Sequence, residues 1–280
     1  MLYQNLGRLV MKKSLVSAAV MFVAFASGSA LAADLPSAPP IYAPGYAPVE
    51  PPCIWCGFYI GINGGWIGAA NDTINNTGTD TGALGLGTAL GLGLIPSSVN
   101  NGGNGNGYLI GGQVGFNWQA GVAVFGVEAD FDGVSALNTT IVGAAPVTTQ
   151  YNQEINWLST VRGRLGIAGS STFFAYATGG LAVGEVKIGN QFICPTCAPP
   201  AFTEPTTTNA NTTTALGWTA GGGLEVMITP HWSVKAEYLY VDLGSHSSVL
   251  TYTYPTGVST LTSSVHNTFN IGRAGVNYKF

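Results

Sequence analysis

The sequence predicts an all-β protein, an eight-stranded antiparallel transmembrane β-barrel with short periplasmic turns and long extracellular loops. Three observations lead to this fold class: a scarcity of charge, a signal for export with no membrane-spanning helix after it, and segments that alternate with a period of two. Only 8% of the 280 residues are charged, against about 25% in soluble domains, while 46% are hydrophobic and 40 are glycine. Part of the surface must therefore face a solvent other than water.

The composition also excludes several other classes. The formal net charge is -4, and Lys12-Lys13 is the only basic pair, so we expect no nucleic-acid partner. The glycines have no period of three, which excludes a collagen-like chain. Apolar and aromatic residues are too frequent for a disordered chain.

The N-terminus has the three regions of a secretory signal peptide. Lys12-Lys13 precede an apolar run over 14–26, and small residues follow as far as Ala32. We predict that residues 1–32 are removed, with cleavage after Ala33 nearly as favourable, and that Met11 is the better start of translation. The protein is thus expected to leave the cytoplasm.

Residues 33–56 are expected to form a proline-rich periplasmic linker. Seven prolines lie between Asp34 and Pro52, which favours an extended polyproline-II spacer. A contact with the cell wall is the alternative, although no side chain in the segment identifies a ligand.

No later segment suits a membrane helix. The longest apolar run, Ala83–Ile95, has 13 residues where a span needs about 20, and it is interrupted by glycines. It could extend the first hairpin or fold into the barrel mouth, but its glycine content favours a flexible loop. A chain without such a helix can still cross a bilayer as a closed barrel, because closure satisfies every backbone group.

Residues 57–280 contain eight segments of alternating polarity, as a barrel requires. They are Gly57–Gly68, Gly107–Gln119, Val122–Asp132, Asn156–Ile167, Phe173–Lys187, Ala215–Ile228, Trp232–Leu243 and His266–Phe280. Tight links at 120–121, 168–172 and 229–231 alternate with long polar connections at 69–106, 133–155, 188–214 and 244–265. Such a barrel is expected in the outer membrane of a Gram-negative cell. Because the number of strands is even, both termini are expected on the periplasmic side.

Charged residues within these segments are predicted to face the lumen. A Lys or Arg facing lipid near the bilayer midplane costs about 2 to 4 kcal/mol, whereas one in the lumen can pair with a carboxylate. In the fifth segment this choice places Phe174 and Tyr176 on the opposite face. The predicted lumen network consists of Glu128, Asp130, Asp132, Arg162, Arg164, Glu185, Lys187, Glu225, Lys235, Glu237, Arg273 and Lys279. Aromatic girdles are expected near the strand ends from Tyr59, Trp66, Trp118, Trp157, Trp232 and Phe280.

Several motifs within these segments resemble one known family. They are Trp55–Gly61, Gly126–Asp130, Thr160–Gly166, Tyr176–Ala182, Lys235–Tyr240 and Asn277–Phe280. The chain is similar in these motifs to the α-proteobacterial outer-membrane immunogenic protein family of small, porin-like, eight-stranded barrels. The resemblance implies that Phe280 is read by the barrel-insertion machinery and that any binding takes place in the loops. The four cysteines and the long Gly/Asn-rich first loop depart from that family.

Two Cys-x-x-Cys pairs allow two interpretations. Cys53/Cys56 and Cys194/Cys197 have the spacing of a zinc knuckle within each pair. The predicted topology separates the pairs across the bilayer, so they cannot share one tetrahedral site. In an oxidising compartment, we therefore expect two local disulfides and no metal.

The expected function is structural. We predict a surface-exposed, porin-like barrel that stabilises the envelope with at most narrow passive permeability, with no catalytic residues and no cofactor. Its expected partners are outer-membrane lipid, lipopolysaccharide and the insertion machinery. One alternative is a receptor for haem or another small ligand through His246, His266, Tyr252 and Tyr254, although the outer loops lack cations for haem propionates. The other is a lipid hydrolase using Ser245-His246-Ser247 with Ser263, Ser264 and His266.

Overall fold

The computed structural model describes residues 53–70, 73–81, 86–100, 106–142, 148–169, 172–193, 206–254 and 257–280. The predicted signal peptide and most of the predicted linker lie outside these ranges. In chain order the elements are β1 (Gly57–Ala69), β2 (Thr73–Thr81), α1 (Leu86–Gly91), β3 (Ser98–Asn100), β4 (Asn106–Ala120), β5 (Ala123–Val142), β6 (Thr148–Ala168), β7 (Phe173–Ile193), β8 (Thr206–Met227), β9 (Trp232–Tyr254) and β10 (Gly257–Lys279). None of the described helical residues belongs to a helix long and apolar enough to cross a membrane.

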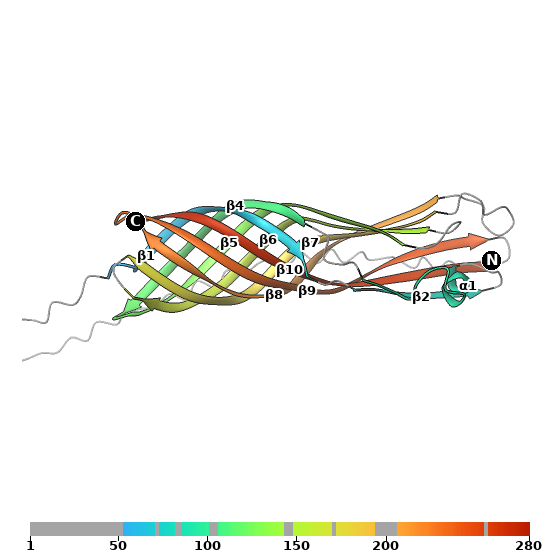
Figure 1. Cartoon of the computed structure of the whole chain (residues 1–280), viewed down its shortest axis with the longest axis horizontal. Coiled ribbons are helices and arrows are strands. Elements are labelled where there is room, and N and C mark those ends of the chain that lie inside the picture. The colour runs from blue at the N-terminus through green and yellow to red at the C-terminus, as the bar shows by residue number, and fades with distance from the viewer. Residues whose placement is uncertain are drawn as a thin grey trace, which may run out of the picture. The chain divides into compact units, whose positions relative to one another are not determined.

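Eight strands close into an antiparallel barrel, which confirms the predicted fold class. They follow one another as β1-β4-β5-β6-β7-β8-β9-β10, and β1 also pairs with β10 to close the ring (Figure 1). Tyr59 lies opposite Lys279 on β10 and opposite Gly115 on β4, so the first strand is hydrogen-bonded on both sides. Each predicted segment lies on one of these eight strands, except that Val122, Ile228 and Phe280 fall one residue outside their strands.

The two ends of the barrel differ, because the strands continue far beyond one of them. At the end with short turns, β4 and β5 are joined by two residues, and Gly121 has a φ of 61° that favours glycine. At the other end, much of the polar sequence predicted as loop is β-strand instead. Strands β5–β8 continue as one sheet and β9, β10, β2 and β3 as another (Figure 1). The β8–β9 ladder stops at Trp218 and Asp242, which separates the two sheets.

The expectation of a flexible loop over Ala83–Ile95 is wrong for residues 86–95. Leu86 and Ala89 of helix α1 are buried, as is Ile95, and they pack with residues of β9 and β10. Asp80 on β2 fixes the start of this helix by accepting hydrogen bonds from the backbone nitrogens of Gly87 (2.9 Å) and Thr88 (2.6 Å). Leu86 and Ala89 have the spacing of one helix face, but the alternation of Leu with Gly in this run hides that pattern in the sequence.

The environment of the Asp80 carboxylate lowers its pKa. Burial opposes ionisation, but the hydrogen bonds from Ser259, Thr88 and Gly87 outweigh it and hold the pKa of Asp80 well below its usual range. The Ser259 hydroxyl donates to Asp80 Oδ1 at 2.5 Å, and the Thr88 hydroxyl donates to Oδ2 at 2.7 Å. The carboxylate therefore connects α1, β2 and β10.

An apolar band surrounds the barrel between two aromatic girdles. At the short-turn end Trp118 stacks on Phe125, and at the other end Phe131 stacks on Trp157. Ten residues separate Tyr108 from Trp118 on β4. At about 3.4 Å per residue and a tilt of about 45°, they span about 24 Å, which matches the thickness of an outer-membrane apolar band. Tyr59, expected in a girdle, points into the lumen instead.

The interior is filled from end to end by three kinds of side chain. An aromatic cluster that includes Trp55 and Phe174 occupies the short-turn end. Charged residues of β5, β6 and β8–β10 follow, and beyond them lies an apolar core that continues between the two sheets. Glycine at two inward positions leaves room for polar side chains of the adjacent strands. A Cβ at Gly61 would collide with Asn277, and one at Gly111 would collide with Asp132.

Candidate functional site: the charged lumen

Nine of the predicted lumen charges lie together inside the barrel. Alternation brings every second side chain of a strand to the same face, so neighbouring strands place their charges at one level. The nine are Glu128, Asp130 and Asp132 on β5, Arg162 and Arg164 on β6, Glu225 on β8, Lys235 and Glu237 on β9, and Arg273 on β10. All are at least 95% buried. Four of them are cations and five are carboxylates, so their formal net charge is -1.

Arg162 lies at the centre of this network. Its Nη2 lies 2.5 Å from Glu128 Oε1 and 2.9 Å from Asp130 Oδ2, and its Nη1 lies 2.9 Å from Glu237 Oε1. The remaining donor, Nε, donates to the Thr160 hydroxyl at 2.9 Å. One guanidinium thus joins carboxylates from β5 and β9, strands on different sides of the ring.

Lys235 and Arg164 extend the network toward the short-turn end. Lys235 Nζ lies 2.8 Å from Glu128 Oε1, and Arg164 Nη1 lies 3.2 Å from Glu128 Oε2. Arg164 Nη2 lies 2.6 Å from Glu225 Oε2, and its guanidinium carbon lies 4.0 Å from the centre of the Tyr176 ring. The cation is therefore paired on its edge and stacked on its face.

Arg273 completes the network on the other side. It pairs with Asp130 at 2.7 Å, with Asp132 at 2.8 Å and with Glu237 at 2.8 Å. Asp130 and Glu237 also bind Arg162, and Arg273 lies 3.9 Å from Glu128 Oε1, so the two arginines share three carboxylates. The nine charges consequently form one continuous cluster.

Uncharged polar residues, which the charge pattern of the sequence does not mark, support this cluster. The Tyr59 hydroxyl donates to Glu128 at 2.7 Å and the Ser233 hydroxyl to Glu225 at 2.5 Å. The Tyr176 hydroxyl donates to Glu237 at 3.0 Å, and the Asn277 amide donates to Glu225 at 2.8 Å. Only the closed ring shows which carboxylate each of these side chains reaches.

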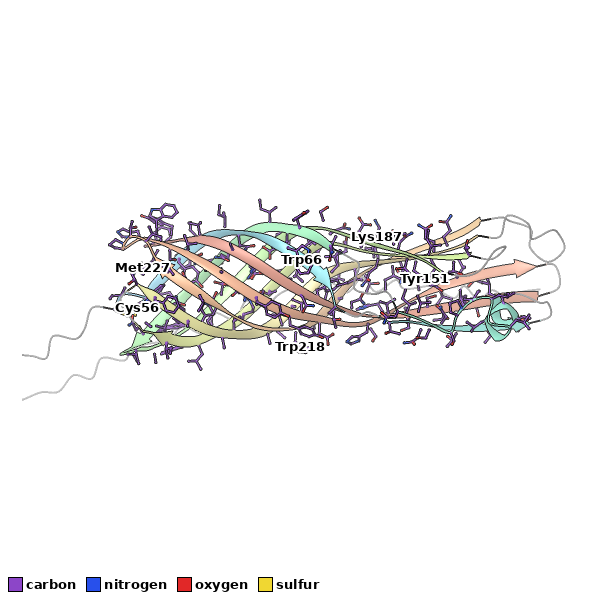
Figure 2. The ribbon with its side chains drawn as sticks, in the orientation of Figure 1. Cys56, Trp66, Tyr151, Lys187, Trp218 and Met227 are labelled. Carbon is purple, nitrogen blue, oxygen red and sulfur yellow. A yellow bond between two sulfur atoms is a disulfide. The ribbon has the colours of Figure 1, made fainter. Side chains whose placement is uncertain are left out.

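The prediction that Glu185 and Lys187 face the lumen is wrong. On β7 the inward positions belong to Phe174 and Tyr176, so the phase of that strand is the reverse of the predicted one. Lys187 pairs with Glu154 at 3.2 Å with 42% of its side chain exposed, and Figure 2 shows it on the extension beyond the barrel. The physical reason is that the outer face of this part of β7 lies beyond the girdle, where charge carries no lipid penalty.

Lys279 does not join the network either. It lies at the short-turn end of β10, where its ammonium group donates to the backbone carbonyl of Ile54. The segment that it holds carries a Cys53–Cys56 disulfide. Within this segment Trp55 is buried, with its ring centre 5.3 Å from that of Phe174. Cys194 and Cys197 lie outside the described residues.

The last predicted site residue lies on the outside of the barrel. Phe280 is 66% exposed and packs against Phe58 and Tyr278 in the girdle at the short-turn end.

Within the described ranges, no group of three or more His, Cys, Asp or Glu side chains could hold a metal ion.

The two histidines considered for haem point to opposite faces of one hairpin. His266 lies opposite Ser245, with both exposed, whereas His246 lies opposite the buried Val265. The side chains of Tyr252 and Tyr254 are outside the described part of the structure. A ligand on one face therefore cannot reach both imidazoles without a rearrangement of the strands.

A closed ring of eight strands with an apolar, aromatic-bordered outer band and a charged interior defines a membrane-spanning β-barrel protein. Residues 54–280 match the family model described as "Outer membrane protein beta-barrel domain", and the chain belongs to this family. It is accordingly a protein of the outer membrane, and the short-turn end is its periplasmic end.

Similar proteins carry names that agree with this family. The chain is 36% identical to the "31 kDa outer-membrane immunogenic protein" of Brucella melitensis, with 95% of this chain and 98% of that protein covered. It is 30% identical to the "22 kDa outer membrane protein" of Rhizobium leguminosarum bv. viciae, with 71% and 69% covered. Among solved structures, it is similar to OprG from Pseudomonas aeruginosa at 13% identity and a TM-score of 0.40, covering 80% of this chain and 96% of that one.

Proposed function

We propose that this protein is a structural, surface-exposed barrel that stabilises the outer membrane and allows at most a narrow passive path for small solutes. The observation that carries the proposal is the continuous ion network across the lumen, in which the Arg162, Glu128, Asp130 and Glu237 side chains have no exposed surface. A wide porin needs a water-filled lumen, but an eight-stranded barrel is only wide enough for its own side chains.

The layers on either side of the network support the same role. Toward the outside, Leu158, Leu239 and Ile271 are buried in an apolar core. Toward the periplasm, Trp55 and Phe174 pack together at the barrel mouth. A hydrated solute would have to pass an apolar layer, a charged layer and an aromatic layer in turn.

The proposed partners follow from the two surfaces. The apolar band would contact lipid and lipopolysaccharide, and the two-sheet extension would display the connections between strands at the cell surface. Phe280, at the end of β10 and exposed to lipid, is proposed as the residue read by the insertion machinery. A contact of residues 33–56 with the cell wall remains a further proposal.

Planar-bilayer recording of the refolded, full-length mature protein tests the closed lumen. We expect no resolved steps, or only small and brief ones, in 1 M KCl. Arg162→Ala should increase the conductance because it removes the side chain that joins both sides of the ring. Lys187→Ala, on the outer face, is the matched control and should change nothing. Large, stable steps from the unmodified protein would refute the closed lumen.

A further inference from the structure

A serine, a histidine and an aspartate form a hydrogen-bonded chain on the outward face of β9 and β10. The Ser245 hydroxyl lies 2.9 Å from His266 Nδ1, and His266 Nε2 lies 3.3 Å from Asp242 Oδ2. With the proton of the imidazole on Nε2, the ring donates to the carboxylate and Nδ1 accepts from the hydroxyl. A nucleophile, a base and an orienting acid are thus connected in sequence, with the partners of Nδ1 and Nε2 exchanged relative to the Ser-His-Asp triad of serine proteases.

Local structure holds these groups in place. Asp242 Oδ1 accepts a hydrogen bond from the Gly244 backbone nitrogen at 2.8 Å. Gly244 has a φ of 76°, and the register between β9 and β10 shifts at this point. The irregularity brings Ser245 opposite His266 on the outward face, whereas Leu243 is buried on the inward face. A bulge that redirects a side chain in this way is a recurrent feature of functional sites.

The hydrogen-bonded side chains of Ser245, His266 and Asp242 lie at the level of the outer lipid-water interface. Tyr240 and Trp218, with ring centres 5.5 Å apart, mark the outer girdle, and Asp242 is the residue paired with Trp218. Ser245 follows a few residues beyond Tyr240, and His266 has 52% of its side chain exposed. Both the ester groups of membrane lipids and water can reach a serine at this level.

The outer wall of the barrel below the girdle is apolar, with Leu224, Val234 and Tyr238 exposed. An open groove of about 1050 Å³ is lined there by small residues that include Ala177, Gly222, Ala236 and Gly272, together with atoms of Tyr176, Glu237 and Arg273. The groove extends to Tyr238 on β9 and does not include the serine, histidine and aspartate. The groove lies on the lipid side, because charged and aromatic side chains fill the lumen at this level.

We propose that Ser245, His266 and Asp242 form a hydrolytic site for the acyl esters of outer-leaflet lipids. Ser245 Oγ bonds to the ester carbonyl carbon while its proton passes to His266 Nδ1. The bond from this carbon to the alcohol oxygen then breaks, and the alcohol takes that proton. Water attacks the acyl-serine, its proton passes through His266 to Ser245 Oγ, and the fatty acid leaves. Asp242 is a positioning residue that holds the tautomer of His266. This activity is additional to the proposed structural role.

The test measures fatty-acid release by the refolded, full-length mature barrel in detergent micelles and in vesicles. One arm supplies phosphatidylethanolamine and the other supplies lipopolysaccharide, which distinguishes the two sources of acyl ester. Ser245→Ala and His266→Ala are expected to lower the rate by about 100-fold or more. The matched control is Ser247→Ala, because Ser247 contacts Ser264 at 3.2 Å on the same two strands, without a histidine. It should leave the rate unchanged within about twofold.

A second readout is independent of the substrate. A fluorophosphonate probe should add covalently to Ser245, as found by mass spectrometry of the digested protein, and His266→Ala should abolish the addition. The heat-dependent gel shift of folded barrels verifies that each variant is folded. If no lipid is hydrolysed faster by the unmodified protein than by Ser245→Ala and the probe does not label Ser245, the three residues are only a polar cluster and the proposal fails. The closed lumen is tested separately by conductance.

Discussion

Replacement of Arg162 by methionine should destabilise the barrel strongly. The substitution keeps a long side chain in the lumen but removes a cation that binds Glu128, Asp130 and Glu237, all with no exposed side-chain surface. Loss of one partner from a buried ion pair costs about 3 to 5 kcal/mol, because the other charge stays buried without compensation.

The geometry places the expected loss near the lower end of that range. Each of the three carboxylates keeps another cation: Glu128 keeps Lys235 at 2.8 Å, and Asp130 and Glu237 keep Arg273 at 2.7 and 2.8 Å. The formal charge of the cluster nevertheless falls from -1 to -2. We expect the free energy of unfolding to decrease by about 3 kcal/mol.

Equilibrium urea unfolding in lipid vesicles measures this change, with tryptophan fluorescence and the gel shift as separate probes. Lys187→Met is the matched control, because its pair with Glu154 is exposed and should contribute less than about 1 kcal/mol. The reasoning fails if Arg162→Met lowers the unfolding free energy by no more than Lys187→Met does. A fall in stability with both probes coincident would support a single cooperative barrel.

Two further predictions concern the ends of the molecule. Asp80→Asn should remove about 1 kcal/mol from the anchoring of α1, measured as faster hydrogen exchange of residues 86–95. Because the folded pKa of Asp80 is lowered, its contribution is fully present above about pH 5 and is lost as the pH falls toward the folded value. Hydrogen exchange of residues 86–95 that does not change on Asp80→Asn at pH 7 would contradict the anchoring role. At the periplasmic end, Trp55→Ala should lower the free energy of urea unfolding by about 3 kcal/mol, because the Trp55 side chain is buried against Phe174. Trp232 is 49% exposed, so Trp232→Ala should lower it much less. Equal losses would show that Trp55 is not part of the barrel core.

The sequence was sufficient to predict the barrel itself. Lipid imposes a period of two on every spanning strand, because charge and backbone polarity must be hidden from the bilayer. Pairs such as Arg162/Arg164 and Lys235/Glu237 therefore revealed the inward face of their strands. The rule that charged residues face the lumen failed for Glu185 and Lys187, because it holds only where lipid surrounds the strand. The sequence does not mark where β7 leaves the membrane.

The tertiary structure alone decided which groups meet. Arg162 and Glu237 are 75 residues apart, and only closure of the ring places them at 2.9 Å. Ser245 and His266 were both visible as residue types, but their contact depends on a shift of register at Gly244 that alternation cannot predict. Local pattern determines the face on which a side chain lies because the pleat is a property of one strand, whereas its partner depends on register and closure, which belong to the whole sheet.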